Sequence, residues 1–154
     1  MLNLKNWYCH PLRVRYQECD SMGVVFHANY VTWFEIGRTE WIRQRGYSYK
    51  AIEEHGLLLP VVDLQCSYLA PARYDDMVLV CTNVAEVSPL KLTFQSQIRK
   101  VAEGQFQPCF TEDAELPGEL LVEGATRHVW LNSQWKPVRL SKQLPELYAA
   151  IGGQ

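Results

Sequence analysis

The fold is decided by residues 29–45, which read NYVTWFEIGRTEWIRQR. Large apolar side chains and one glycine recur there at every third or fourth position, which is the spacing of one helix face: Tyr30, Trp33, Phe34, Gly37 and Trp41. Val31, Ile36 and Ile42 widen this stripe. A helix with so broad an apolar arc cannot lie on a surface with half of its circumference in water. We therefore expect a long helix that is enclosed by something large, such as a curved sheet.

The polar side of this predicted helix carries Glu35, Arg38, Glu40 and Arg43. A spacing of three residues between each Glu and the following Arg suits ion pairs on a solvent-facing surface. Gly46 follows, and a glycine at this point favours the left-handed residue that ends a helix. We expect the charged side of the helix to face water.

Downstream of this helix the sequence period changes to two. After a short helix over 49–55, alternating apolar and polar residues predict strands, with Ser88-Pro89 as a hairpin turn. A first strand is expected at 13–17, and a terminal helix at 141–151 with Pro145 in its first turn. The stretch 102–118 is rich in Glu, Gln, Pro and Gly, which predicts a long hairpin loop. The later strands are expected at 62–68, 78–87, 90–99 and 119–131.

Length and composition place these elements in one domain, residues 1–154. The chain is 47% hydrophobic, which is enough to bury a real core, and no repeat or linker divides it. The element order is one strand, a long helix and four mostly antiparallel strands. We therefore predict an α+β fold in which a long central helix is wrapped by a curled, mostly antiparallel sheet of about five strands.

Charge and cysteine content exclude several function classes. The 15 Lys and Arg against 17 Asp and Glu give a net charge of −2, which indicates no nucleic-acid partner. The sequence contains no run of about 18 apolar residues, so no membrane-spanning helix is predicted. The five cysteines form no metal or redox motif, so we expect reduced thiols and a cytoplasmic protein. Residues 1–7 lack the apolar segment of a signal peptide, and we expect no export.

Unusual residues are densest in 16–30, YQECDSMGVVFHANY. Asp20 lies there just before the predicted helix, whose unpaired backbone N–H groups and positive dipole end favour negative charge. Those N–H groups can hold an oxyanion during acyl transfer, while the carboxylate delivers or activates an oxygen nucleophile. The alternative is that Asp20 only caps the helix or a turn, as loop aspartates before helices usually do.

This segment also carries a family resemblance. Asp20, Gly23-Val24-Val25, His27 and Asn29-Tyr30, followed by Glu35 and Arg38, resemble the signature of hot-dog-fold acyl-CoA thioesterases of the 4-hydroxybenzoyl-CoA thioesterase class, particularly its YbgC-like branch. Residues 71–76, PARYDD, are similar to the loop that opens the third strand in that family. Glu18 is a departure, because many relatives carry Asp or Thr there, but it leaves Asp20 in place.

The resemblance implies an enzyme that hydrolyses an acyl-CoA thioester to a free carboxylic acid and coenzyme A. It implies no cofactor beyond the coenzyme A of the substrate, and the scattered histidines indicate no metal site. It makes Asp20 and His27 the catalytic residues, and it implies assembly into a homodimer or homotetramer with the CoA arm between two subunits. The substrate-binding positions that it implies are Gly23, Val25, Asn29 and Tyr30.

Two roles stay open for each catalytic candidate. With an unperturbed pKa near 4, Asp20 is ionised at neutral pH and can attack the carbonyl directly or act as a general base. The resemblance implies that His27 acts through its backbone N–H, and the YbgC-like branch implicates its imidazole as well. A neutral imidazole could polarise the carbonyl or orient water. Gly23 is explained by a tight turn or a close approach to ligand.

Other residues support weaker interpretations. Cys19 adjoins Asp20, but no lysine lies close in sequence to lower its pKa, so we expect a half-buried thiol. His10, His55 and His128 lack the spacing of a zinc site. The Asp75-Asp76 pair resembles a site with paired carboxylates, but its place after Pro71 at the start of a strand is more typical of a turn cap that faces solvent. Candidate cations for the CoA phosphates are Arg73, Lys91, Arg99 and Lys100.

Two rival functions fit the same fold. One is another hot-dog enzyme that acts on acyl thioesters, a hydratase or dehydratase. The other is a non-catalytic module that binds acyl-CoA and releases no thiol. The acyl group itself is not readable from the sequence, because pocket depth depends on how the helix packs.

Overall fold

The computed structural model describes residues 7–153. Residues 1–6, on which the prediction about export largely depends, lie outside that range. No helix in the described range is long and apolar enough to cross a membrane.

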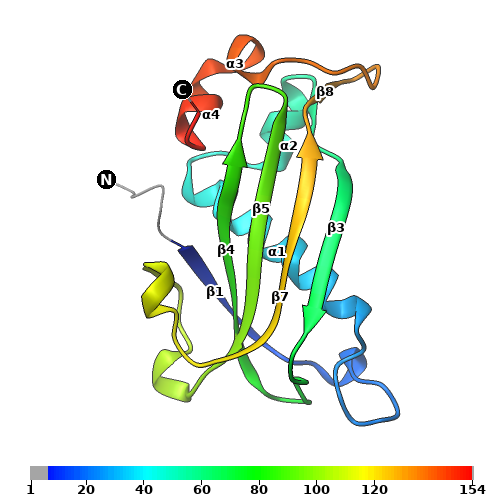
Figure 1. The fold of residues 1–154 in the computed structure, drawn as a ribbon, viewed down its shortest axis with the longest axis vertical. Helices are drawn as coiled ribbons and strands as arrows, with labels where there is room; N and C mark the ends of the chain where they lie inside the picture. Colours follow the sequence, from blue (N-terminus) through cyan, green and yellow to red (C-terminus); the bar gives the residue numbers. More distant parts are fainter. Residues whose placement is uncertain (1–6, 154) are drawn as a thin grey trace.

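A six-stranded sheet forms the frame of the molecule (Figure 1). Its strands lie in the order β3-β7-β5-β4-β1-β6, and every neighbouring pair is antiparallel. A separate two-stranded ribbon joins β2 (Leu57–Leu58) to β8 (Leu131–Asn132). The sheet strands are β1 (Trp7–Arg13), β3 (Val61–Tyr68), β4 (Met77–Val87), β5 (Lys91–Lys100), β6 (Cys109–Thr111) and β7 (Glu119–Val129).

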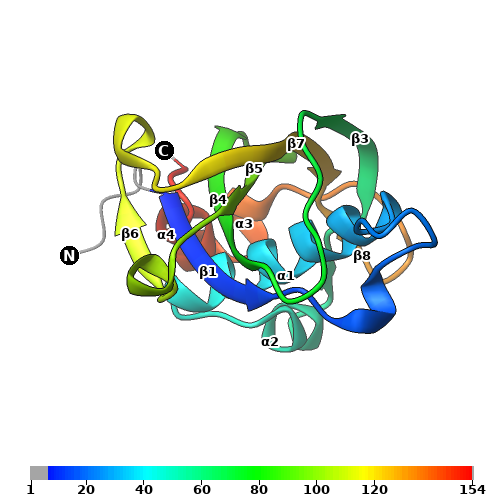
Figure 2. The same cartoon turned by 90° about the horizontal axis from the view of Figure 1, so that it is seen from below.

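One long helix, α1 (Ala28–Gln44), packs against one face of this sheet, and the sheet curls around it (Figure 2). The predicted order of a long helix followed by strands is confirmed, and so is the short helix α2 (Tyr49–Glu54). Gly46 and Gly56 follow these helices with φ of +88° and +76°, the left-handed backbone that glycine adopts without strain. The remaining helices are α3 (Leu140–Gln143), α4 (Pro145–Ala150) and the 3-10 turns Tyr16–Glu18, Glu103–Gln105 and Asp113–Glu115.

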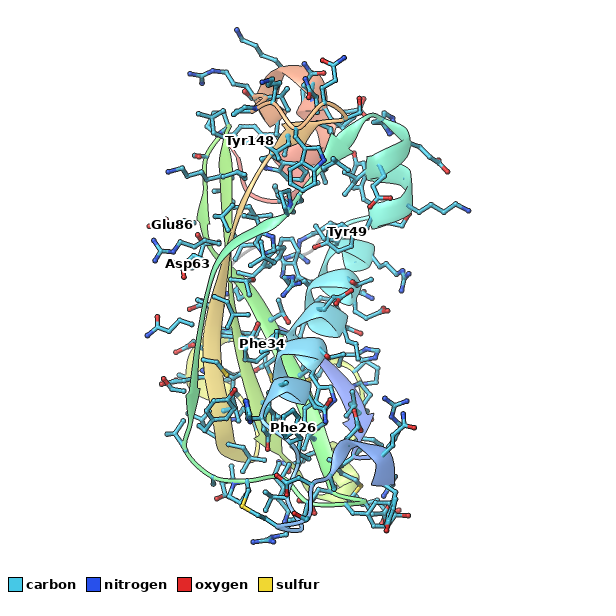
Figure 3. All side chains as sticks on the ribbon, turned by 90° about the vertical axis from the view of Figure 1, so that its right-hand side faces the viewer. Phe26, Phe34, Tyr49, Asp63, Glu86 and Tyr148 are labelled. Carbon is cyan, nitrogen blue, oxygen red and sulfur yellow. The ribbon has the colours of Figure 1, made fainter. Side chains whose placement is uncertain are left out.

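The core lies between α1 and the sheet. Trp33, Phe34, Trp41 and Ile42 of α1 are each fully buried, as the sequence pattern predicts. Figure 3 shows Phe34 between the helix and the strands, and it shows Asp63 and Glu86 on the opposite side of the sheet. This arrangement leaves the N-terminus of α1 at the lower end of the sheet, next to the loop that follows β1 (Figure 1).

Gly37 explains how closely α1 approaches the sheet. A Cβ added at this position would lie 2.7 Å from Cγ1 of Val80 and would also collide with the Thr82 hydroxyl, both on β4. Real side chains do not approach that closely, so only glycine fits at this crossing. The helix is thereby held at a fixed distance from the strands that position its N-terminus.

Three element predictions need correction. The first strand is Trp7–Arg13 and not 13–17, because Tyr16–Glu18 forms a 3-10 turn. The stretch 102–118 contains β6, which pairs with β1. The terminal helix is two short helices, because Leu144, which precedes Pro145, has an extended φ of −149°.

Arg38 is also placed differently from the prediction. Glu40 and Arg43 form the expected ion pair at 2.6 Å, but Arg38 is only 8% exposed. Its guanidinium lies beside the hydroxyl of Tyr49, on the helix that follows α1. Arg38 therefore belongs to the buried side of α1, covered by α2, and not to the charged face.

Candidate active site

Asp20 lies in a tight loop between β1 and α1. The Asp20 N–H donates to the carbonyl of Val24 at 2.9 Å, and the Gly23 N–H donates to the carbonyl of Asp20 at 3.0 Å. Gly23 has a φ of +80°, so the turn uses the left-handed backbone for which glycine is suited. The loop therefore presents the Asp20 side chain from a short, hydrogen-bonded turn.

The Asp20 carboxylate has one oxygen engaged by this turn. Its Oδ1 accepts a hydrogen bond from the Met22 N–H at 2.9 Å, which is the Asx turn considered as an alternative role. Among residues 7–153 no donor to Oδ2 is found. Asp20 also lines a pocket, so the turn and a chemical role are compatible, with one oxygen left for water or substrate.

The start of α1 lies at the same pocket. His27 is the N-cap residue and makes no side-chain capping bond, and its φ and ψ of −54° and −33° are already helical. Within the described part of the chain, the N–H groups of His27 and Ala28 have no hydrogen-bond acceptor. Unpaired amides at a helix N-terminus, together with the helix dipole, stabilise negative charge.

The pocket has a volume of about 290 Å³ and a mostly apolar lining. One wall comes from the loop and the start of α1, and the other comes from the end of β3 and the residues after it. The lining residues are Asp20, Met22, Val24, Val25, His27, Tyr30, Tyr68, Leu69, Ala70 and Pro71.

Tyrosines join the two walls. The Tyr68 hydroxyl donates to the carbonyl of His27 at 3.1 Å, and the Tyr30 hydroxyl accepts from the Ala72 N–H at 3.0 Å. The Tyr68 ring packs edge-on to the imidazole of His27, with centroids 6.2 Å apart. Burial, Cys66 and Tyr30 raise the pKa of Tyr68 to about 12, so its hydroxyl stays protonated and remains a donor.

Four of the six predicted site residues line this pocket: Asp20, His27, Val25 and Tyr30. Gly23 and Asn29 do not. Gly23 shapes the turn, and the Asn29 amide donates to the carbonyl of Glu18 at 2.8 Å. Contact of Gly23 and Asn29 with substrate therefore stays a prediction, while their support of the loop is visible.

The second wall was missed by sequence reasoning. Tyr68 to Pro71 lie some forty residues beyond the motif, and only the end of the alternating strand and the proline mark them. In the sequence Glu18 is only a departure from the family pattern, yet it is 5% exposed and its carboxylate accepts a hydrogen bond from Trp33 Nε1 at 2.7 Å. A buried carboxylate has no sequence signal that separates it from a surface one.

The other residues considered from the sequence, Cys19 and the Asp75-Asp76 pair, do not line the pocket. Burial and the nearby carboxylates of Glu18 and Asp20 raise the pKa of the Cys19 thiol, which disfavours the thiolate. Asp76 caps a turn by accepting from the Arg73 N–H at 2.8 Å. No group of three or more metal-ligating side chains occurs within residues 7–153.

The candidate cations do not form one cluster. The Arg99 guanidinium donates to the carbonyls of Pro117 and Gly118, and Lys100 pairs with Asp76 at 3.5 Å. Lys91 lies on a different hollow of the sheet. Arg73 is exposed and follows the pocket residue Pro71 by two positions, so it is the best placed of the four.

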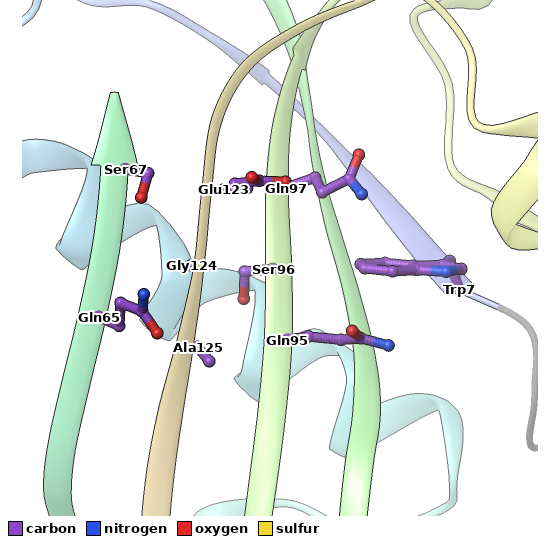
Figure 4. A pocket seen from close by; sticks show the side chains of 9 residues that line it. All are labelled: Trp7, Gln65, Ser67, Gln95, Ser96, Gln97, Glu123, Gly124 and Ala125. Atoms are coloured by element: carbon purple, nitrogen blue, oxygen red, sulfur yellow. The ribbon is translucent and has the colours of Figure 1, made fainter. Parts of the chain in front are cut away.

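A second hollow, of about 220 Å³, lies on the face of the sheet away from α1 (Figure 4). Its side chains are mainly the polar ones that alternate with the core residues of the strands, including Gln65, Gln95 and Gln97. It adjoins no helix N-terminus, and its one carboxylate is Glu123. The pocket at Asp20 is therefore the better candidate for acyl chemistry.

Known proteins resemble this chain over most of its length. The model of the thioesterase superfamily matches residues 22–105. YneP of Bacillus subtilis is 32% identical over 140 residues, 90% of this chain and 91% of that protein. The acyl-CoA thioesterase YbgC of Haemophilus influenzae is 35% identical over 98 residues, 63% of this chain and 72% of that protein.

Solved structures agree with the sequence matches. The structure of DHNA-CoA thioesterase from Staphylococcus aureus has a TM-score of 0.80 and 32% identity, and the match covers 94% of this chain and 87% of that one. The long helix, the antiparallel sheet and these matches confirm the predicted hot-dog fold. The chain belongs to the thioesterase superfamily.

Proposed function

We propose that this protein hydrolyses an acyl-CoA thioester to a carboxylic acid and coenzyme A, with Asp20 as the catalytic carboxylate. One observation carries the proposal: the Asp20 carboxylate and the unpaired N-terminus of α1 adjoin the same apolar pocket. YbgC of Haemophilus influenzae, which is named an acyl-CoA thioesterase, supports the substrate class. The coenzyme A is part of the substrate, so no separate cofactor is proposed.

The reaction needs a nucleophile and a site for the developing oxyanion. Water supplies an oxygen to the carbonyl carbon, the C–S bond breaks, and the CoA sulfur takes the displaced proton. Asp20 either attacks first, giving an anhydride that water then opens, or removes a proton from the attacking water. The N–H groups of His27 and Ala28 are the donors proposed for the carbonyl oxygen.

The imidazole of His27 is proposed as a second catalytic group. It is exposed at the pocket, it is packed against Phe26 and Tyr68, and it has no hydrogen-bond partner among residues 7–153. It is therefore available to polarise the carbonyl or to orient water.

A homodimer, or a tetramer of two dimers, is proposed for the active form. β3 is the last strand at one side of the sheet, and nearly all of its residues are exposed. A long exposed edge with apolar side chains, such as Val62 and Leu64, favours pairing with another strand. Tyr68 and Leu69, at the end of β3, line the pocket, so a partner on this edge would lie beside the site.

A cytoplasmic location is proposed from the thiols. All five cysteines are unpaired, including Cys9, which lies opposite Cys81 and Cys109 on neighbouring strands. Free thiols in such close register suit a reducing compartment.

The direct test is thiol release from a panel of acyl-CoA esters with short, long and aromatic acyl groups. We expect turnover of at least one ester, with the acid and free CoA formed in equal amounts. Hydration of enoyl-CoA without thiol release would instead assign a hydratase. Binding of the esters in calorimetry without turnover of any of them would assign a non-catalytic module.

A further inference from the structure

Glu18 is the one acidic residue in the described chain that is buried, at 5% exposure. Burial of a charge is costly unless hydrogen bonds replace its hydration. Oε1 accepts from the Arg15 N–H at 2.8 Å, and Oε2 accepts from Trp33 Nε1 at 2.7 Å. The Arg15 guanidinium adds longer contacts of 3.4 Å to both oxygens. The carboxylate thus connects the chain before the catalytic loop to the second turn of α1.

The backbone of the same residue connects the other end of the loop. The Glu18 carbonyl accepts from the Phe26 N–H at 2.9 Å and from the Asn29 amide at 2.8 Å. Between these attachments the loop is narrowed by the bridge of Cys19 to Val25. Donors from both sides of the Asp20 loop therefore meet at one residue, two positions before Asp20.

From these contacts we propose that Glu18 is a positioning residue, which holds the Asp20 loop against the N-terminus of α1 and does not touch substrate. Glu18 is absent from the pocket lining, whereas its partners Phe26 and Asn29 lie on either side of His27 at the start of α1, and Asp20 lies two positions after Glu18. This role rests on the proposed thioesterase function.

The network requires an ionised carboxylate. Both oxygens face N–H donors, so an amide at this position would turn its own N–H₂ toward one of them. Burial raises the pKa of Glu18, but the hydrogen bonds from the Arg15 N–H and Trp33 outweigh it, and the pKa lies below its usual value. The Glu18 carboxylate is therefore charged at neutral pH.

The test compares Glu18→Gln, Trp33→Phe and the double variant with wild type, by kcat and KM for an acyl-CoA that wild type hydrolyses. Misplacement of a catalytic group by about 1 Å costs up to about a hundredfold in rate, so we expect Glu18→Gln to lower kcat by about that factor. KM should change by less than about threefold, because the pocket lining is unchanged. Trp33→Phe should lower kcat less, and the double variant should be no slower than Glu18→Gln, since both changes remove the same contact.

Combination with Asp20→Asn separates positioning from general stability. If Glu18 acts through Asp20, Glu18→Gln should cause no further loss of kcat in the Asp20→Asn background. Glu40→Gln, which removes a carboxylate paired with Arg43 on the open side of α1, is the matched control and should keep wild-type kcat. Circular dichroism at the assay temperature establishes that each variant is folded, and if Glu18→Gln does not fold, Trp33→Phe carries the same comparison.

Two results would overturn the positioning role. One is a folded Glu18→Gln protein with wild-type kcat, and the other is an equal loss of kcat from Glu18→Gln in the wild-type and the Asp20→Asn backgrounds. Failure of the proposed function would look different, because wild type itself would then release no thiol from any ester. The comparison of Glu18 variants is therefore made with an acyl-CoA ester that wild type hydrolyses.

Discussion

His27 contributes two separate groups to the start of α1, a backbone N–H and an imidazole. If only the N–H stabilised the oxyanion, alanine would keep it and most of the rate. We predict instead that His27→Ala lowers kcat/KM by about a hundredfold, the scale of a positioned side-chain catalyst. Steady-state kinetics beside circular dichroism measures this. His55→Ala, at the exposed end of α2, is the control, and a folded His27→Ala with nearly unchanged kcat/KM would remove the imidazole from the mechanism.

His128 makes the stability of the protein depend on pH. Burial, and secondly the charge of Arg38, lower its pKa from 6.5 to about 4, although the hydrogen bond to the Leu59 carbonyl opposes this. The folded protein therefore keeps His128 neutral while the unfolded chain takes up a proton below pH 6.5. This contribution to stability is complete above pH 6.5 and is lost as the pH falls through about 4, by roughly 3 kcal/mol in all.

We predict that His128→Gln removes this part of the pH dependence. The measurement is the free energy of unfolding of both proteins between pH 7 and pH 4.5, by denaturant titration. Wild type should lose more stability than the variant over this interval. Parallel curves would mean that His128 is protonated in the folded state too.

The crossing of α1 and β4 depends on a single small residue. Gly37→Ala should favour the helix slightly, yet the added Cβ meets Val80 and Thr82, so we predict a net loss of about 1 to 3 kcal/mol. Thermal unfolding measures it. Gly104→Ala, with no atom near the added Cβ, is the control and should change stability by less than about 0.5 kcal/mol. Equal melting temperatures for Gly37→Ala and wild type would contradict the tight packing.

The elements that sequence reasoning found are those with a local pattern. The repeat from Tyr30 to Trp41 specifies α1, because helix periodicity lies within the segment itself. β6 has only three residues, and its partner β1 lies about a hundred positions earlier, so no local signal marks it. Pro11 is tolerated in β1 because, among residues 7–153, β6 pairs with Trp7–Cys9 and no strand lies beside the proline on that side.

The site was predictable only on one side. Asp20 and His27 belong to one continuous motif next to a helix start, and chemistry at such a start is recognisable from sequence. Tyr68 and Leu69 reach the pocket because β3 ends there, which depends on tertiary structure. Burial of Glu18 and Arg38 likewise depends on what packs over them, and not on residue type.

At the scale of the whole molecule, the exposed edge strand β3 is the basis of the proposed assembly. We predict that the protein sediments as a dimer or tetramer at micromolar concentration. The double variant Val62→Lys with Leu64→Lys should shift it toward monomer, since charge on an edge strand opposes pairing. Analytical ultracentrifugation measures both. Tyr74→Lys, at an exposed residue outside β3, is the control. A wild-type monomer with full activity would refute the proposed assembly.

The most direct test of the account is kcat/KM of Asp20→Asn with an acyl-CoA that wild type hydrolyses. Asparagine keeps an oxygen that can accept from the Met22 N–H, so the loop and the melting temperature should be preserved, while the charge is lost. We predict a fall of about a thousandfold or more, as expected for removal of an essential nucleophile or base. Asp75→Asn, in an exposed turn outside the pocket, should keep wild-type activity. A folded Asp20→Asn protein with near-normal kcat/KM would contradict the proposal that this carboxylate drives the hydrolysis.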